Sequence, residues 1–208
     1  MFDNNNVKKY NTKMITSVIL SAGRSQRFGS PKALAVIKGK TIIEHLQEKL
    51  LQTQSQGIIV VLGADADRIR PFLLNHKRIK VVYNKDYIFG QTSSFKAALD
   101  NLRDDSLGAL LLPVDCPAVK IQTVDLLINT FINNKIDILI PSFENRKGHP
   151  PIFHTDLKTE ITALDNSLGL NTLARKHAAK TEILPVSDSG VIKTFNTVKE
   201  FEEIEKFI

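Results

Sequence analysis

The sequence predicts an α/β fold in which helices cover both faces of a mostly parallel central sheet. First, five runs are apolar almost throughout instead of alternating with polar residues, as strands buried on both faces are. Second, helix-like segments separate these runs, and a repeated strand-helix-strand order favours parallel strands joined by right-handed crossovers. The predicted strands are residues 17–22, 57–63, 79–84, 108–114 and 137–142.

Helices are predicted between consecutive strands. The fourth has Thr123 and Asp125 near its start, and both residue types suit a helix N-terminus, where backbone N–H groups lack partners. The predicted helices are Thr41–Gln52, Asp65–Leu74, Thr92–Leu102 and Ile121–Asn133.

The last third of the chain departs from this alternation. We expect a loop or ribbon that leaves the sheet and returns, two helical pieces, a strand pair around the turn-forming sequence Ser-Asp-Ser-Gly, and a closing charged helix. These segments are residues 141–153, 156–164 and 170–178, then 181–186 with 190–196, and finally 199–207.

Length and composition are those of one globular domain. The chain has 208 residues, of which 42% are hydrophobic and 24% charged. The stretch over residues 1–13 is polar, and residues 1–15 are expected to form a flexible leader before a single domain over residues 16–208. Cys116 is the one cysteine, which excludes a disulfide within the chain and favours a reducing, cytoplasmic compartment.

Charge and hydropathy restrict the partners. The net charge of +6 fits either a solvated basic surface or an anionic ligand. No block of Lys and Arg is interleaved with aromatic residues, so nucleic acid is not expected as a partner. No apolar run approaches the roughly 20 residues that span a bilayer, so a membrane is not expected either.

A basic loop follows the first predicted strand, in the stretch "SVILSAGRSQRFGSPKAL" over residues 17–34. It is not a Walker A loop, because Gly23 and Gly29 are six positions apart and Ser-Pro separates Gly29 from Lys32. It also lacks the G-x-G-x-x-G pattern of dinucleotide sites. Two common nucleotide-binding motifs are therefore excluded.

The same loop nevertheless has the chemistry of a phosphate site. It lies at the carboxyl end of a buried strand, where open α/β sheets bind ligands. Gly23 permits close approach of backbone N–H groups to an anion, and Arg24, Arg27 and Lys32 add three positive charges. A surface loop with ordinary basic residues is the alternative.

Four stretches together resemble the MobA-like NTP transferase family, within the sugar-nucleotide-type nucleotidyltransferases. "LSAGRSQRFGSPKAL" resembles the family's opening signature, and "LLLPVDCP" (110–117) resembles its strand that ends in Asp. "FGQTSSFKAAL" (89–99) and "RKGHPPIF" (146–153) are similar to motifs of the molybdenum cofactor cytidylyltransferase branch. The signature positions are Leu20, Ala22, Gly23, Arg27, Phe28, Gly29, Pro31 and Lys32.

The sequence departs from the family pattern at four positions. Ser21 stands where the cytidylyltransferases usually have Ala and the guanylyltransferases Gly. In the tail stretch "VIKTFNTVKEFEEI" (191–204), Thr194 and Asn196 replace carboxylates and Val198 replaces Pro. The nucleobase and the details of the metal shell therefore stay open.

The resemblance implies a Rossmann-like three-layer sandwich of the nucleotide-diphospho-sugar transferase type. It also implies Mg²⁺-dependent transfer of NMP from an NTP to a phosphate-bearing acceptor, with release of pyrophosphate. The implied catalytic residues are Arg27, Lys32 and Asp115, with Asp115 and Asn196 as metal ligands and Gly148 and His149 as acceptor-binding residues. The implied nucleotide-binding residues are Leu20, Ser21, Ala22, Gly23, Arg24, Lys32, Gln91, Thr92, Ser93 and Ser94.

Structural roles stay open for several of these residues. Asp115 can be a structural carboxylate, and Asn196 can cap the last helix. The polar stretch 91–94 can serve as a helix N-terminus, and a lone histidine such as His149 is more often structural than catalytic. Cys116 is expected to be buried and unreactive.

The specific function that the resemblance favours is molybdenum cofactor cytidylyltransferase, which joins CMP from CTP to molybdopterin and has a molybdenum hydroxylase as a further partner. One alternative is a related cytidylyl- or guanylyltransferase with another phosphorylated acceptor. A second is a carrier or chaperone that holds a molybdenum cofactor without catalysing a reaction.

Overall fold

The computed structural model of the chain describes residues 14–208, and strands form at all five positions predicted for the central sheet. These are β1 (Met14–Ser21), β4 (Gly57–Leu62), β5 (Ile79–Tyr83), β6 (Ser106–Pro113) and β7 (Ile138–Phe143). The sheet also contains β8 (Arg146–Lys147), β9 (Ile152–His154) and β10 (Thr181–Pro185), and a separate hairpin pairs β2 (Val36–Ile37) with β3 (Lys40–Thr41).

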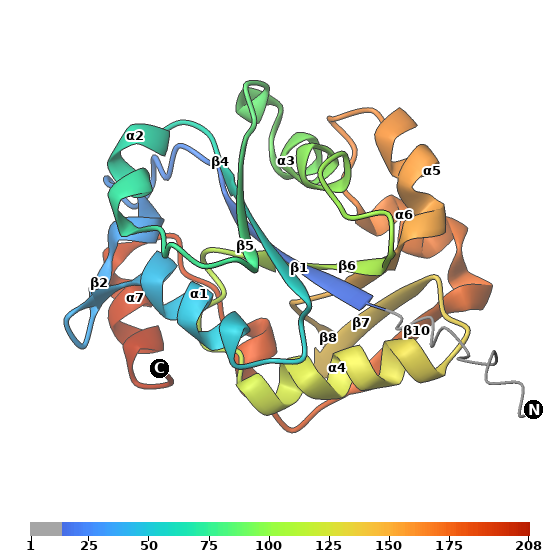
Figure 1. The fold of residues 1–208 in the computed structure, drawn as a ribbon. Helices are drawn as coiled ribbons and strands as arrows, with labels where there is room; N and C mark the ends of the chain where they lie inside the picture. The colour runs from blue at the N-terminus through green and yellow to red at the C-terminus, as the bar shows by residue number, and fades with distance from the viewer. Residues whose placement is uncertain (1–13) are drawn as a thin grey trace, which may run out of the picture.

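The sheet is mostly parallel, as predicted. Its strand order is β10-β7-β9-β6-β1-β4-β5, with β8 paired to β7. The pairs β1–β4, β1–β6, β4–β5 and β7–β10 are parallel, whereas β9 runs antiparallel to both β6 and β7. β1 lies in the interior of the sheet, with β6 on one side and β4 on the other (Figure 1).

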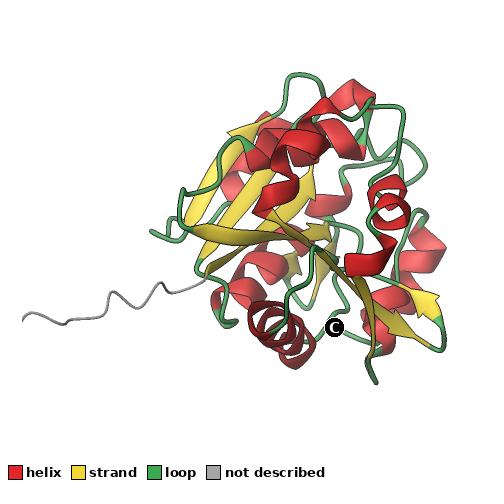
Figure 2. Ribbon diagram, turned by 90° about the vertical axis from the view of Figure 1, so that its right-hand side faces the viewer, coloured by secondary structure: helices red, strands yellow, loops and turns green. Residues whose placement is uncertain are grey.

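Helices cover both faces and complete three layers (Figures 1 and 2). One hydrophobic cluster joins the sheet to α1, α4 and α7, and a second joins its opposite face to α3, α5 and α6. The bounds are α1 (Ile42–Leu51), α3 (Gln91–Leu99), α4 (Ile121–Asn133), α5 (Lys158–Ala163), α6 (Asn171–Lys176) and α7 (Val198–Glu205), with the short α2 (Ala66–Ile69) near the first cluster.

β1 shows why the predicted strands are apolar on both faces. Ile15 and Ile19 belong to the cluster under α1 and α4, whereas Val18 and Leu20 belong to the cluster under α3. Successive side chains of a strand point to opposite faces, so a strand between two helical layers buries both sets.

The helix predicted at Asp65–Leu74 was too long. The structure has α2 over Ala66–Ile69 and then a 3₁₀ turn over Arg70–Phe72. Pro71 accounts for the difference, because proline has no N–H to donate and its ring crowds the preceding turn of an α-helix.

The strand pair predicted for residues 181–186 and 190–196 was wrong in its second member. β10 forms, but it pairs in parallel with β7. The Asp188 carboxylate accepts from the N–H of Gly190 at 2.9 Å, and residues 189–192 form a 3₁₀ turn. The carbonyl of Val191 then accepts from the N–H of His149 at 2.7 Å, so this backbone bonds to the 146–153 segment instead of to β10.

The ribbon predicted at residues 141–153 leaves the sheet as a hairpin. β7 pairs with β8 across Glu144 and Asn145, and both turn residues have positive φ, as in the two-residue turns that join antiparallel strands. The chain then returns as β9 between β6 and β7.

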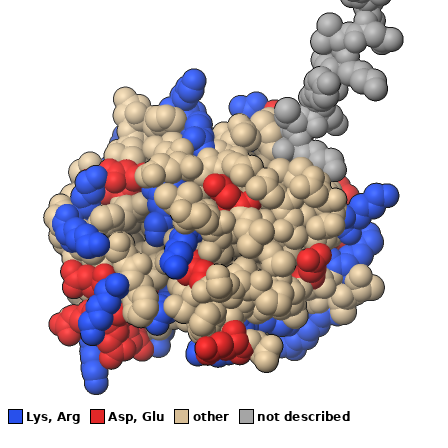
Figure 3. All heavy atoms as spheres, turned by 90° about the horizontal axis from the view of Figure 1, so that it is seen from below, with Lys and Arg blue, Asp and Glu red and all other residues tan. Residues whose placement is uncertain are grey.

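The leader predicted for residues 1–15 lies outside the described residues up to residue 13, and Met14 and Ile15 belong to β1. Within residues 14–208, no helix is long and apolar enough to cross a membrane. Acidic and basic side chains are interspersed over the face seen in Figure 3.

Gly63, the residue after β4, generates a prediction about stability. A Cβ at this position would lie 2.5 Å from the carbonyl oxygen of Ala22 and 2.7 Å from the Cβ of Tyr87. We expect Gly63→Ala to lower the free energy of unfolding by about 1–3 kcal/mol, the usual cost of overpacking, in urea denaturation.

Gly57→Ala, at the start of the same strand, is the matched control. There a Cβ would contact Thr16 at 3.6 and 3.7 Å, which are ordinary van der Waals distances. Equal stabilities of the two variants would contradict the proposed close approach of Gly63 to the loop after β1.

Candidate active site

A cleft of about 680 Å³ opens at the carboxyl end of β1 and β6. The loops after β1, β5 and β6 and the segment before α7 form its walls. It brings together twelve of the residues proposed from sequence: Leu20, Ser21, Ala22, Gly23, Arg24, Arg27, Lys32, Gln91, Ser94, Asp115, His149 and Asn196. Thr92, Ser93 and Gly148 do not line it.

Ser25 shapes the basic loop after β1. It adopts a left-handed backbone conformation, with φ of 49°, and its carbonyl accepts from the N–H groups of Phe28 at 3.0 Å and Gly29 at 3.2 Å. Its hydroxyl accepts from the N–H of Lys32 at 3.2 Å. Ser25 therefore joins both ends of the loop, a role that its sequence position did not signal.

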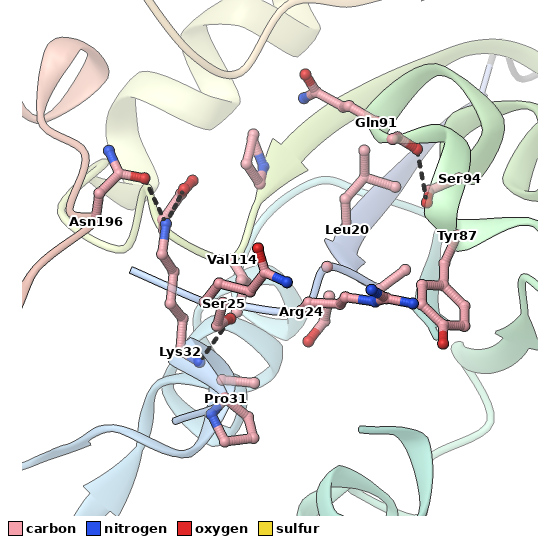
Figure 4. Close-up of a pocket in the computed structure, with 18 of the residues that line it drawn as sticks. Leu20, Arg24, Ser25, Pro31, Lys32, Tyr87, Gln91, Ser94, Val114 and Asn196 are labelled. Atoms are coloured by element: carbon pink, nitrogen blue, oxygen red, sulfur yellow. Dashed lines mark hydrogen bonds and ion pairs between the residues drawn. The ribbon is translucent and has the colours of Figure 1, made fainter. Parts of the chain in front are cut away.

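The ammonium group of Lys32 is the centre of the polar contacts in the cleft (Figure 4). It lies 2.7 Å from a carboxylate oxygen of Asp115 and 2.9 Å from the side-chain oxygen of Asn196. Arg27 donates to the same Asn196 oxygen at 2.9 Å. Four residues predicted from three separate motifs thus meet in one hydrogen-bonded group.

An aromatic cluster of Phe28, Phe195 and Phe201 holds this group together. The ring centroids lie 5.3 Å apart for Phe28–Phe195, 5.7 Å for Phe28–Phe201 and 4.9 Å for Phe195–Phe201. Such pairs stabilise beyond the area they bury. Because Phe28 follows Arg27 and Phe195 precedes Asn196, packing of the rings brings the two polar side chains together.

The N-terminus of α7 also fixes Asn196. The Glu200 carboxylate accepts from the backbone N–H of Asn196 at 2.6 Å and of Thr197 at 3.0 Å. These hydrogen bonds lower the pKa of Glu200. Thr197 accepts in return from the N–H of Glu200, which makes a capping box. Asn196 therefore precedes the cap, and its side chain stays available to the cleft.

Arg24 belongs to the opposite wall. Its guanidinium carbon lies 5.8 Å from the centroid of the Tyr87 ring, within the range of a cation–π contact. Figure 4 shows Arg24 extending toward Tyr87 and away from Lys32. Tyr87 was not proposed from sequence, and no local pattern marks it as a residue of the cleft.

The polar stretch 91–94 divides between the cleft and the protein interior. Gln91 and Ser94 line the cleft. The Thr92 hydroxyl donates to the carbonyl of Leu168 at 2.8 Å, and the Ser93 hydroxyl donates to the carbonyl of Asp86 at 2.8 Å. Thr92 and Ser93 thus have structural hydrogen bonds away from the cleft.

Of the next two proposed residues, Gly148 packs against the backbone of Val191 and His149 faces the cleft. A Cβ on Gly148 would lie 2.2 Å from the carbonyl oxygen of Val191, so glycine there permits close packing of two segments. His149 faces the cleft, and its Nδ1 is buried with no hydrogen-bond partner among the described residues. Burial lowers the pKa of His149, and the Asp115 carboxylate opposes that effect.

A buried carboxylate, Asp188, and a partly buried ammonium, Lys49, support the loop that carries Asp115. The Asp188 carboxylate accepts from the N–H of Lys120 at 2.9 Å and from the Thr123 hydroxyl at 2.7 Å. Lys49 donates to the carbonyl of Pro117, and burial lowers the pKa of Lys49 to about 8 against an opposing effect of Asp188.

Cys116 is fully buried, as expected from its position in the motif. Burial raises the pKa of its thiol, and the Asp115 carboxylate raises it further. The thiolate form that reacts or binds metal is therefore disfavoured.

Comparison with known proteins identifies the family. The family model for the MobA-like NTP transferase domain matches residues 17–181. The chain belongs to the MobA-like NTP transferase family. The match begins within β1 and ends at the first residue of β10, so it includes the basic loop, Gln91, Ser94, Asp115 and His149.

Two curated proteins that are similar to this chain in sequence are named for different activities. A nicotine blue oxidoreductase of Paenarthrobacter nicotinovorans is 27% identical, covering 89% of this chain and 94% of its own length. A probable molybdenum cofactor guanylyltransferase of Bacillus cereus is 28% identical, covering 71% of this chain and 72% of its own length.

Solved structures share the whole architecture. The Mycobacterium tuberculosis protein Rv0371c has a TM-score of 0.80 and 25% identity, covering 93% of this chain and 98% of its own. A manganese complex of that protein has a TM-score of 0.77 and 23% identity, covering 94% of this chain and 100% of its own. The Rossmann-like three-layer fold predicted from sequence is thereby confirmed, and the chain is a nucleotidyltransferase of the MobA-like family.

Lys49 generates a prediction about pH. Because its pKa falls from 10.5 to about 8 on folding, the folded chain binds fewer protons than the unfolded chain between these values. The contribution of Lys49 to stability is therefore present above pH 10.5 and is lost as the pH falls through 8. As the pH rises from 8 to 10.5, we expect the free energy of unfolding of the wild-type chain to increase by about 1–3 kcal/mol more than that of Lys49→Met.

Chemical denaturation of both proteins at several pH values measures this difference. Lys40→Met is the control, since the Lys40 side chain is 49% exposed and pairs with Glu48 at the surface. Parallel stability profiles of the wild type and Lys49→Met would show that burial of Lys49 has no effect on its ionisation.

Proposed function

We propose that this protein transfers a nucleoside monophosphate from an NTP to a phosphate-bearing acceptor, with release of pyrophosphate. The observation that carries the proposal is the meeting of Arg27, Lys32 and Asp115 at the carboxyl end of β1 and β6, in one cleft with Gly23 and Arg24. Cationic side chains and a glycine-containing loop suit a triphosphate, and the carboxylate suits a metal ion bound to it.

The reaction needs positioning and charge neutralisation more than a strong base. An acceptor phosphate, with its second pKa near 6, is already an anionic nucleophile at neutral pH. Its oxygen forms a new bond to the α-phosphorus while the bond to the bridging oxygen of pyrophosphate breaks. Arg27 and Lys32 neutralise the charge on the triphosphate, and the rigid loop held by Ser25 keeps them in place.

The oxygens of Asp115 and Asn196 fit a hard divalent metal ion, for which we propose Mg²⁺. Both oxygens already converge on one cation, within 2.7 and 2.9 Å of the Lys32 nitrogen. Mg²⁺ prefers oxygen ligands and commonly takes only one or two from the protein. When bound, it would neutralise charge on the triphosphate. The manganese complex of the structural neighbour supports divalent metal binding.

For the nucleotide we favour CTP. Leu20, Ser21, Gln91 and Ser94 line one part of the cleft and offer amide and hydroxyl groups to a base and ribose. Ser21 carries a side chain where glycine would leave more room, and the smaller space favours a pyrimidine. GTP is the competing choice, because the curated relative is named a guanylyltransferase.

For the acceptor we favour molybdopterin, held by His149, with Gly148 shaping the turn and a molybdenum hydroxylase receiving the product. The unpartnered Nδ1 of His149 supports this assignment, since a buried nitrogen without a partner is available to a ligand. A related transferase with another phosphorylated acceptor and a non-catalytic cofactor carrier are alternatives. The relative named an oxidoreductase makes a redox activity a further outcome to test.

The first experiment is a thermal-shift panel of CTP, GTP, ATP and UTP with and without Mg²⁺. A nucleotide at 100 times its Kd stabilises by about 2.7 kcal/mol, which corresponds to a rise in Tm of about 5–10 °C for a chain of this size. The best nucleotide is then incubated with molybdopterin, and pyrophosphate release is measured. Binding without pyrophosphate release would favour the carrier.

Asp115→Asn tests the metal ligand. It preserves shape and removes charge, so we expect kcat to fall at least about 100-fold and the remaining activity to require more Mg²⁺. Pyrophosphate release measured over a Mg²⁺ titration checks this. An unchanged titration would leave Asp115 with a structural role alone.

His149→Ala tests the acceptor site. We expect the KM for molybdopterin to rise at least about 10-fold while nucleotide affinity, measured without acceptor, stays the same. Gly148→Ala is a useful comparison, because its Cβ would collide with the backbone of Val191 and reduce stability instead. Loss of nucleotide binding in His149→Ala would contradict an acceptor-specific role.

A further inference from the structure

The side chain of Lys32 is mostly buried, and its ammonium lies beside the oxygens of the proposed metal site. It is 11% exposed, compared with 26% for Asp115. Its nitrogen contacts both proposed metal ligands, at 2.7 Å for Asp115 and 2.9 Å for Asn196. Within residues 14–208, no group of three or more His, Cys, Asp or Glu side chains forms a separate metal site.

We infer that Lys32 is a placeholder cation: without metal, its ammonium holds Asp115 and Asn196 in the metal-ligating arrangement, and it must leave them when metal binds. This inference rests on the proposed function, because it deepens the role of the same site. It assigns Lys32 a positioning role in the free protein in addition to its contact with the triphosphate.

Charge supports the placeholder role. A carboxylate in a partly buried cleft is costly unless it is paired, and Lys32 supplies the ion pair that the structure records for Asp115. Arg27 also donates to the oxygen of Asn196. A dication at the same oxygens would meet two nearby positive charges, so the free protein disfavours metal binding as long as Lys32 and Arg27 remain there.

A nucleoside triphosphate removes this electrostatic obstacle to metal binding. Its phosphates offer Lys32 and Arg27 new anionic partners in the same cleft, which frees the oxygens of Asp115 and Asn196 for the metal. Metal and nucleotide therefore favour each other's binding, and the coupling is reciprocal by thermodynamic linkage. Metal binds weakly to the free protein and well to the nucleotide complex.

The experiment measures Mn²⁺ binding to the nucleotide-free protein by electron paramagnetic resonance, since the signal of free Mn²⁺ is lost on binding. Lys32→Met should bind Mn²⁺ at least about 10-fold more tightly than the wild type, because the competing ammonium is gone. Lys32→Gln, whose amide can still donate to Asp115, is the second variant in case Lys32→Met fails to fold, and it should also bind more tightly.

Arg27→Met is the matched control for charge. It removes the same unit of charge from the cleft, but Arg27 contacts Asn196 and not Asp115. Its gain in Mn²⁺ affinity should be less than about 3-fold. Lys40→Met removes a surface charge that pairs with Glu48 and should change nothing. Adding Asp115→Asn to Lys32→Met should abolish the gain.

Two outcomes would overturn the inference: Lys32 variants that bind Mn²⁺ no better than Arg27→Met, or a gain that survives Asp115→Asn. Neither outcome depends on catalysis. If the Lys32 variants gain Mn²⁺ affinity but the wild type releases no pyrophosphate with any nucleotide and acceptor, the placeholder role stands and the proposed function fails.

Discussion

The site depends on the parallel pairing of β1 with β6. In this register Leu20 is the partner of Pro113, so the two strands end together and their following loops leave the sheet side by side. Lys32, in the basic loop, and Asp115 are 83 positions apart in sequence, yet their side chains meet at 2.7 Å. Burial of β1 on both faces holds the two loops on a rigid base.

The C-terminal segment completes the cleft through packing instead of strand pairing. Phe195 is fully buried and contacts Phe28 and Phe201, which brings Asn196 to Lys32 and Arg27. Among the residues that the structure describes, the resulting cleft has more positive than negative side chains, a balance that suits a highly charged anion. Among the described residues, the cleft has one carboxylate, that of Asp115, and it pairs with Lys32, the least exposed of the cations.

Local sequence patterns predicted the elements whose burial is uniform. The five central strands, α1, α3 and α4 formed where apolar runs and helical patterns indicated them. Predictions failed where specific hydrogen bonds or a proline override the secondary-structure propensity of a segment. The apolar stretch at 190–196 is not a strand, because Asp188 bonds Gly190 and Val191 bonds His149. Pro71 shortened the second helix for a reason that was visible in sequence.

The sequence by itself determined the fold class, the basic loop and the position of Asp115, because strand burial and loop chemistry are properties of short contiguous segments. Only the tertiary structure decided which polar residues face the cleft: Gln91 and Ser94 do, whereas Thr92 and Ser93 bond to Leu168 and Asp86. It also decided that Tyr87 lies against Arg24 and that Asn196 meets Lys32. Such contacts join residues far apart in the chain, and their geometry follows from packing that no local pattern encodes.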